Sequence, residues 1–179
     1  MNPTQNTART SARQLRLMAF DVDGVLTNGD LYFTPAGDEI KVFSSLDGHG
    51  LKMLQEAGIK VAIITGRQSG MVERRVENLG IRHLYQGVKD KRSVMVKLCA
   101  ELGIEPHQAG YMGDDVVDLP ILLACGFSAT VADGHDFVKN HVLAVASKGG
   151  GRGAVREICD FILDAQGKLN PMLESYLNT

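Results

Sequence analysis

The sequence of 179 residues predicts an α/β fold built on a doubly wound parallel sheet, as in Rossmann-like proteins. Short apolar segments alternate along the chain with helix-length amphipathic segments, which is typical of strands joined by crossover helices. Only the segment 31–43 departs from this alternation, and it predicts a β-hairpin that projects from the sheet. We therefore expect a single domain over residues 15–167, with no separate cap domain.

Short apolar or β-branched segments predict six strands. The clearest is Lys60–Thr65 (KVAIIT), because a continuous run of such residues is typical of a strand buried on both faces. Another strand, Arg16–Phe20, is bounded by Asp21. Four further segments carry a weaker signal: Arg82–Gln86, Ala109–Met112, Phe127–Val131 and Val142–Ala146.

Three helices are predicted between the strands from apolar side chains that recur at helical spacing. They span Gly48–Ala57, Gly70–Leu79 and Asp90–Leu102. A glycine follows each of them, at the position where glycine commonly ends a helix: Gly58, Gly80 and Gly103.

The segment LYFTPAGDEIKVF, residues 31–43, places two β-rich runs around Pro-Ala-Gly-Asp and so predicts the hairpin. An antiparallel ribbon at this point does not easily join a parallel sheet. We expect it to pair with the hairpins of other subunits. Both ends of the chain are polar: we expect residues 1–14 to form a disordered arm, and residues 168–179 to form a tail that either covers a partner's site or is disordered.

Composition excludes several classes of partner. A formal net charge of −2 gives no reason to expect a nucleic acid or an anionic membrane as partner. No apolar run approaches the roughly 20 residues that span a bilayer. Cys99, Cys125 and Cys159 are widely spaced among apolar neighbours, which favours buried, reduced thiols in a cytoplasmic protein.

Acidic residues gather where two of the predicted strands end. Asp21 and Asp23 close the first strand, while Asp114, Asp115 and Asp118 follow the strand that ends in YMG. In a parallel sheet these ends share one edge, and ligands bind outside that edge. So many carboxylates at one place need a cation. Their oxygens suit Mg²⁺, and the donor set disfavours zinc.

Hydroxyl, glycine and basic residues accompany the acids. Thr65, Gly66 and Arg67 end the KVAIIT strand, and Lys91 opens a helix. Together with Mg²⁺ this set suits phosphoryl transfer, with Lys91 neutralising phosphate charge and Thr65 binding phosphate oxygens. Lys89 is a rival for the lysine role.

The two aspartates of DVD suit covalent catalysis. Asp21 is placed to attack phosphorus and form an aspartyl-phosphate. Asp23, two residues later, would protonate the leaving alkoxide and then deprotonate the incoming water.

The order DVDGVLT, TGR, a lysine opening a helix, and GDDVVDLP resembles the four motifs of the haloacid dehalogenase superfamily of phosphatases. The likeness covers most of the chain and implies a HAD-like fold. It also implies the following roles: Asp21 as nucleophile and metal ligand, Asp23 as general acid/base with its backbone carbonyl on Mg²⁺, Thr65 and Lys91 on phosphate, Asp114 as metal ligand, and Asp115 and Asp118 in support.

The spacing of the motifs leaves no room for a cap, so the site either takes a macromolecule or is covered by a neighbouring subunit. The hairpin favours the second alternative. The capless core, the hairpin, ACG, VADG and the GGxGAxRE tail resemble the 3-deoxy-D-manno-octulosonate 8-phosphate phosphatase family. That resemblance implies a homotetramer that hydrolyses a small acidic sugar phosphate and yields a lipopolysaccharide precursor.

Three points stay open. Phosphatases of sialic-acid-type sugar 9-phosphates share nearly the same motifs, so the sugar is undecided. Arg152 and Arg156, beside the helix start after Gly153, suit a substrate carboxylate or phosphate, as do Gly66 and Arg67, but the arginines act in either the same or a neighbouring subunit. A non-catalytic oligomeric module remains an alternative, whereas the order of the motifs argues against a signalling receiver domain.

Overall fold

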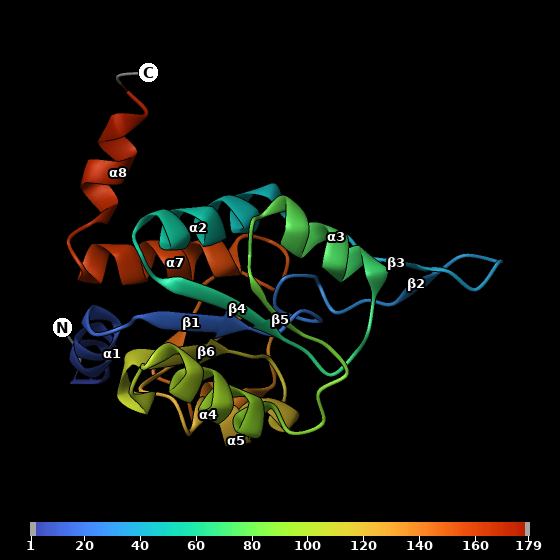
Figure 1. Ribbon diagram of the computed structural model, residues 1–179, viewed down its shortest axis with the longest axis horizontal. Coiled ribbons are helices and arrows are strands. Elements are labelled where there is room, and N and C mark those ends of the chain that lie inside the picture. The colour runs from blue at the N-terminus through green and yellow to red at the C-terminus, as the bar shows by residue number, and fades with distance from the viewer. Residues whose placement is uncertain (1–2, 178–179) are drawn as a thin grey trace.

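Six parallel strands form the central sheet of the computed structural model, which describes residues 3–177 (Figure 1). In space they are ordered β5-β4-β1-β6-β7-β8, and every neighbouring pair is parallel. The order reverses between β1 and β6, and in such sheets a crevice opens at this switch point, outside the carboxyl ends of the strands. The strands are β1 Leu17–Phe20, β4 Lys60–Ile64, β5 His83–Tyr85, β6 Ala109–Met112, β7 Phe127–Thr130 and β8 Ala144–Val145.

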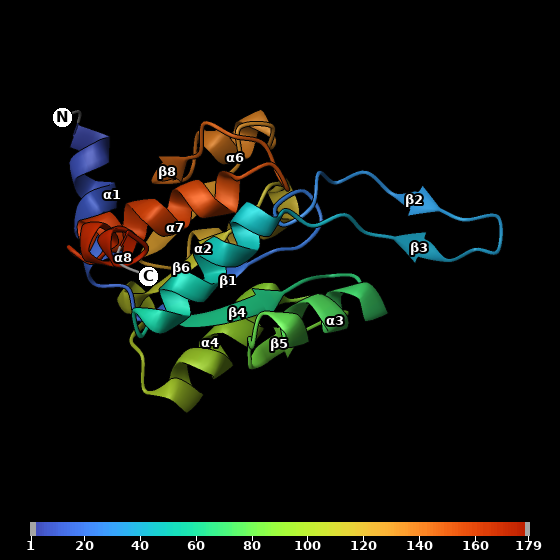
Figure 2. The ribbon, with the colours of Figure 1, turned by 90° about the horizontal axis from the view of Figure 1, so that it is seen from above.

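Helices cover both faces of the sheet, with α2 and α7 side by side on one face and α4 and α5 on the other (Figures 1 and 2). Their bounds are α1 Pro3–Arg13, α2 Ser45–Glu56, α3 Gly70–Asn78, α4 Lys91–Leu102, α5 Leu119–Leu122, α6 Asp136–Lys139, α7 Ala154–Ala165 and α8 Leu169–Ser175. Two short 3₁₀ helices span Pro106–Gln108 and Val116–Asp118. The predicted doubly wound architecture is confirmed.

The central strand β1 shows why a continuous apolar run is needed here. Met18 and Phe20 lie in the core that includes α2 and α7, whereas Leu17 and Ala19 lie in the core that includes α4. All four side chains are fully buried. Because successive side chains alternate between faces, burial on both faces requires every residue of the strand to be apolar.

The predicted helices are present with small shifts of their ends. Helix α2 starts at Ser45 rather than Gly48, because the Ser44 hydroxyl accepts a hydrogen bond from the Asp47 N–H and caps the helix earlier. At the end of α4, Gly103 adopts the left-handed conformation, with φ of 61°, that the glycine signal predicted.

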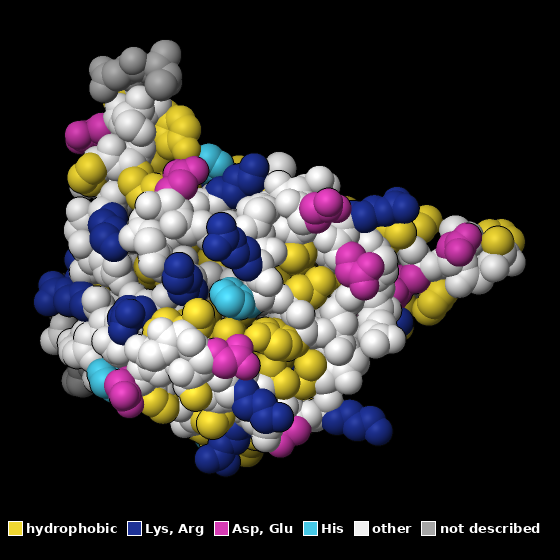
Figure 3. All heavy atoms as spheres, in the orientation of Figure 1, with side chains coloured by type: hydrophobic (Ala, Val, Ile, Leu, Met, Phe, Trp, Pro, Cys, Tyr) yellow, Lys and Arg dark blue, Asp and Glu magenta, His cyan; other side chains and the backbone are white. Residues whose placement is uncertain are grey.

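The hairpin predicted at residues 31–43 projects well beyond the sheet (Figures 1 and 2). Its strands, β2 (Tyr32–Phe33) and β3 (Glu39–Ile40), are antiparallel and form a two-stranded sheet of their own. Hydrophobic side chains are visible on the projecting hairpin in Figure 3. The exposed ones are Leu31, Tyr32, Phe33, Ile40 and Val42.

The expected disordered arm is wrong for the residues described, because residues 3–13 form helix α1. Ala8 and Ala12 are buried in the core beside α7. Arg9 Nη1 also contacts Asp164 Oδ2 at 2.5 Å. These tertiary contacts stabilise a helix that has no long apolar side chain between Pro3 and Arg13. Residues 1–2 of the arm lie outside the described part.

Part of the expected C-terminal tail is also helical. Helix α8 occupies 169–175, and Tyr176 meets His49 of α2 edge-on, with ring centroids 5.6 Å apart. Residues 178–179 lie outside the described part. Among residues 3–177, no helix is both long and apolar enough to cross a membrane.

Candidate active site at the carboxyl edge of the sheet

Three carboxylates meet at the switch point of the sheet. Asp21 directly follows β1, Asp114 follows β6 after one glycine, and Asp118 ends the 3₁₀ helix Val116–Asp118. One oxygen of each lies within 4.8 Å of the others. Asp21 and Asp118 are buried, so their charges repel in a medium that screens them weakly.

The side chain of Lys91 brings one positive charge to this carboxylate cluster. Its Nζ donates to Asp21 Oδ2 at 2.5 Å and to Asp118 Oδ1 at 2.6 Å. Asp118 is held further by the Tyr111 hydroxyl at 3.3 Å and by the Asp114 N–H at 3.1 Å. Asp118 thus fixes the lysine, and the lysine fixes the carboxylate of Asp21. This geometry favours Lys91 over Lys89, which only lines the adjoining cavity.

A single lysine does not neutralise the cluster. Burial raises the pKa of Asp114 to about 7, and the charges of Asp21 and Asp118 add to the effect. Burial and the charge of Asp118 also raise the pKa of Asp21 to about 6, although Lys91 acts in the opposite direction. Carboxylate oxygens with excess negative charge are the ligands that Mg²⁺ prefers. The donor set therefore fits the magnesium ion expected from the sequence, with Asp21 and Asp114 as the residues that would hold it.

We expect Mg²⁺ to stabilise the protein more at pH 7.5 than at pH 5.5. Without metal, a carboxyl whose pKa is raised in the folded state contributes stability that is fully present below its ordinary pKa of 3.8 and is lost as the pH rises from there through the folded values of about 6 and 7. Bound Mg²⁺ removes the repulsion that appears in that window. The rise in melting temperature on adding Mg²⁺ measures this. Asp114→Asn should flatten the pH dependence, and an equal rise at both pH values would contradict the expectation.

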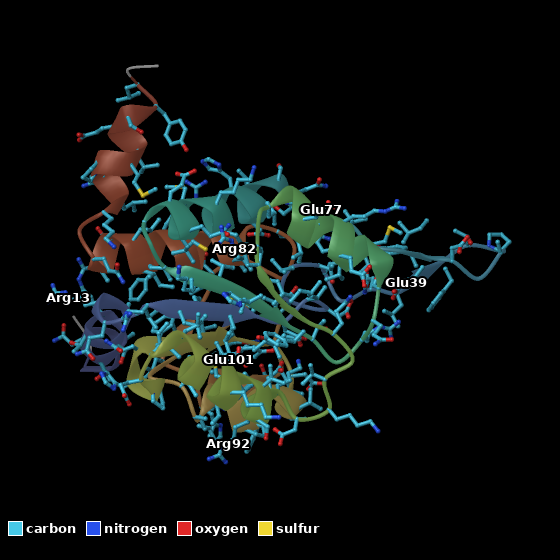
Figure 4. The ribbon with its side chains drawn as sticks, in the orientation of Figure 1. Arg13, Glu39, Glu77, Arg82, Arg92 and Glu101 are labelled. Atoms are coloured by element: carbon cyan, nitrogen blue, oxygen red, sulfur yellow. The ribbon has the colours of Figure 1, made fainter. Side chains whose placement is uncertain are left out.

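The carboxylate of Asp23 lies outside the cluster of Asp21, Asp114 and Asp118 and faces the base of the hairpin. Its Oδ1 accepts from Lys41 Nζ, and its Oδ2 is 3.8 Å from Arg67 Nε. Glu39, labelled in Figure 4, contacts Arg67 Nη2 at 2.8 Å. The sequence predicts Asp23 as a metal ligand through its backbone carbonyl, and its side chain contacts Lys41 and Arg67. Lys41 and Glu39 were not anticipated at all.

A cavity of about 440 Å³ opens beside the cluster. Thr65 directly follows β4 and is only 2% exposed, and its N–H donates to the Tyr85 carbonyl, which fixes the turn. Asp115 caps the following 3₁₀ helix through the Val116 N–H, and it too faces the cavity. The predicted residues that line the cavity are Asp21, Asp23, Thr65, Gly66, Arg67, Lys89, Lys91, Asp114 and Asp115.

The glycine-rich segment before α7 packs against the loop that follows Asp21. A Cβ atom added at Gly150 would collide with the Gly24 carbonyl oxygen, so only glycine fits. The Gly150 N–H donates to Asp133 Oδ1 at 2.9 Å, and the Gly151 N–H donates to the Val25 carbonyl at 2.9 Å. This segment therefore supports the aspartate loop from outside.

The structure does not bring the two predicted arginines, Arg152 of this segment and Arg156 of α7, into the cavity. Neither Arg152 nor Arg156 is among the described residues that line it. Arg156 Nε instead donates to Asp160 Oδ1 at 2.7 Å, one turn further along α7. Arg152 is exposed. A role for them in the cavity of their own chain is therefore not supported, because helix α7 directs Arg156 to its own acidic neighbour.

Comparison with known proteins agrees with this geometry. A family model for haloacid dehalogenase-like hydrolases matches residues 30–126. The 3-deoxy-D-manno-octulosonate 8-phosphate phosphatase KdsC of Salmonella typhi is 44% identical over 168 residues, which cover 94% of this chain and 89% of the relative.

Solved structures give the same result. A 3-deoxy-D-manno-octulosonate 8-phosphate phosphatase from Yersinia pestis superposes with a TM-score of 0.90 at 44% identity, over 92% of this chain and 89% of that one. The enzyme from Moraxella catarrhalis, solved with a magnesium ion, a phosphate ion and a KDO molecule, superposes with a TM-score of 0.93 at 40% identity, over 96% and 98%. The chain therefore belongs to the haloacid dehalogenase-like hydrolases and, within them, to the family of the 3-deoxy-D-manno-octulosonate 8-phosphate phosphatases.

Proposed function

We propose that this protein hydrolyses 3-deoxy-D-manno-octulosonate 8-phosphate to 3-deoxy-D-manno-octulosonate and phosphate, with Mg²⁺ as cofactor. The observation that carries the proposal is the buried Asp21–Lys91–Asp118 arrangement beside an open cavity. It occurs in a chain that is 44% identical to the 3-deoxy-D-manno-octulosonate 8-phosphate phosphatase of Salmonella typhi. We also propose that the product is a lipopolysaccharide precursor.

In the first step, Asp21 attacks phosphorus and forms an aspartyl-phosphate while the bond from phosphorus to the sugar oxygen breaks. Its Oδ1 is oriented by the Val22 N–H at 2.7 Å and its Oδ2 by Lys91 at 2.5 Å. Asp23 donates a proton to the leaving sugar oxygen. Thr65 and Lys91 bind the phosphate oxygens. Mg²⁺, when bound, would neutralise part of the phosphate charge.

In the second step, Asp23 takes a proton from water, which attacks phosphorus and releases phosphate from Asp21. The same carboxyl thus acts first as acid and then as base, and it ends the cycle in its starting protonation state. Gly66 and Arg67, which line the cavity, are proposed to bind the acidic sugar of the substrate. Arg152 and Arg156, which do not line the cavity of their own chain, are proposed to serve the cavity of a neighbouring subunit.

Phosphate release tests the function directly. We expect strong turnover of 3-deoxy-D-manno-octulosonate 8-phosphate with Mg²⁺ and none with a chelator, beside weak turnover of a sialic-acid-type 9-phosphate and of an aryl phosphate. Preference for the 9-phosphate would show that the nine-carbon sugar is the substrate and would leave the proposed mechanism unchanged. No turnover of any of them would overturn the proposal in favour of a non-catalytic module.

We further propose a homotetramer in the cytoplasm. Exposed apolar side chains on the hairpin supply a surface that self-association would bury. Cys99, Cys125 and Cys159 are all unpaired, which suits a reducing compartment. Light scattering that returns the 19.4 kDa of one chain would refute the tetramer, and recovery from a periplasmic fraction would refute the location.

A further inference from the structure

Lys41 is an unusual lysine, because its side chain is buried at the base of the exposed hairpin. The side chain is only 3% exposed. Its neighbours in sequence, Ile40 and Val42, are 50% and 64% exposed. The residues that follow β3 at the base of the hairpin therefore place the charged side chain inward, and its neighbours on either side place their apolar side chains outward, the reverse of the usual preference. A buried ammonium is stable only beside partners that compensate its charge.

Those partners are two carboxylates. Lys41 Nζ donates to Asp23 Oδ1 and lies 3.3 Å from Glu39 Oε1. Arg67 closes the network, with Nη2 2.8 Å from the same Glu39 oxygen and Nε 3.8 Å from Asp23 Oδ2. Two cations and two anions thus alternate, and one of the anions is the carboxylate to which the proton transfers are assigned.

Lys41 contacts Asp23 from outside the cavity. Among the described residues that line the cavity, Asp23 and Arg67 are present but Lys41 and Glu39 are not. The ammonium is occupied by carboxylates and does not face the space where phosphate would bind. This separates its role from that of Lys91, which lines the cavity and contacts Asp21.

We propose that Lys41 is a positioning residue for Asp23. By holding Oδ1, it fixes the rotamer of the carboxyl and leaves Oδ2 to give a proton to the leaving sugar oxygen and to take one from water. Glu39 in turn holds the ammonium in place. Proton transfer needs donor and acceptor within hydrogen-bond reach, so a carboxyl free to rotate loses most of its effect. The inference rests on the proposed function, in which Asp23 is the acid and base.

The test compares leaving groups. A sugar alkoxide must be protonated as it departs, whereas p-nitrophenolate departs without a proton. Water attack on the aspartyl-phosphate is common to both substrates, so we compare kcat/KM, which reports only the steps up to departure of the leaving group. For Lys41→Met we expect kcat/KM on the sugar 8-phosphate to fall by about 10²-fold, and kcat/KM on p-nitrophenyl phosphate to fall by less than about fivefold. Lys41→Arg should restore most of the loss. Lys97→Met, which changes an exposed lysine of α4, should behave as the parent protein.

A double variant tests the same inference independently. In an Asp23→Asn background, Lys41→Met should add less than about a twofold loss, because the group that it positions is already gone. Equal losses of kcat/KM on both substrates, or a raised KM at unchanged kcat, would overturn the inference. If Lys41→Met fails to fold, Glu39→Gln takes its place, because it removes the second carboxylate that holds the ammonium and should lower kcat/KM more on the sugar phosphate than on p-nitrophenyl phosphate. If the parent turns over another alkyl phosphate but not the 8-phosphate, the proposed substrate fails and the same comparison is made on that alkyl phosphate.

Discussion

Replacing Asp21 with asparagine is expected to abolish turnover, with a loss on the order of 10³-fold or more. The amide cannot attack phosphorus, so the covalent phosphoenzyme should disappear as well. Acid quenching after mixing with radiolabelled substrate measures that intermediate, and phosphate release measures turnover.

The same substitution is expected to preserve the fold. An asparagine oxygen still accepts the Val22 N–H, and Lys91 keeps its second partner, the carboxylate of Asp118. Removing one of several repelling charges should leave the melting temperature of the metal-free protein unchanged or raised. Retained turnover in a folded Asp21→Asn variant would show that another group is the nucleophile.

Replacing Lys91 with methionine is expected to have the largest effect on stability. It removes the ammonium from between Asp21 and Asp118, which then face each other buried and unpaired. Breaking a buried ion pair from one side costs about 3–5 kcal/mol of the free energy of unfolding. Urea unfolding of the metal-free protein measures this cost, and turnover should be lost in the same variant.

Lys89→Met is the matched control for that prediction. Lys89 lines the same cavity but makes no contact with Asp21 or Asp118 among the described interactions. Its loss should change the free energy of unfolding by less than about 1 kcal/mol. Equal destabilisation by the two variants would contradict the assignment of Lys91 as the lysine of the cluster.

Most of the fold could be predicted because its signals are local. The run KVAIIT and the glycines after three helices depend on neighbours in sequence alone. Helix α1 could not be predicted in this way. Its burial rests on Ala8 and Ala12, which are too small to form an apolar stripe, and on contacts of Arg9 with α7 that no local pattern contains.

In the candidate site too, residues placed by local signals could be predicted, and residues placed by tertiary packing could not. Asp21 and Asp114 could be placed together because both follow strands of a parallel sheet. Lys41 could not be placed at the site. It lies between the apolar residues Ile40 and Val42, and an alternation of polar and apolar residues does not tell which face is buried. Asp118 was expected as a supporting group, but its position between Lys91 and the Asp114 N–H depends on the packing of α4 against the 3₁₀ helix.

The place of β1 between β4 and β6 has a consequence for how the molecule is made. Strand β6 comes about half the chain after β1, yet the two are neighbours in the sheet. A chain emerging from the ribosome therefore carries Asp21 as an isolated, hydrated charge until most of the protein has been synthesised. The repulsive carboxylate cluster is assembled late, when the surrounding core is available to hold it together.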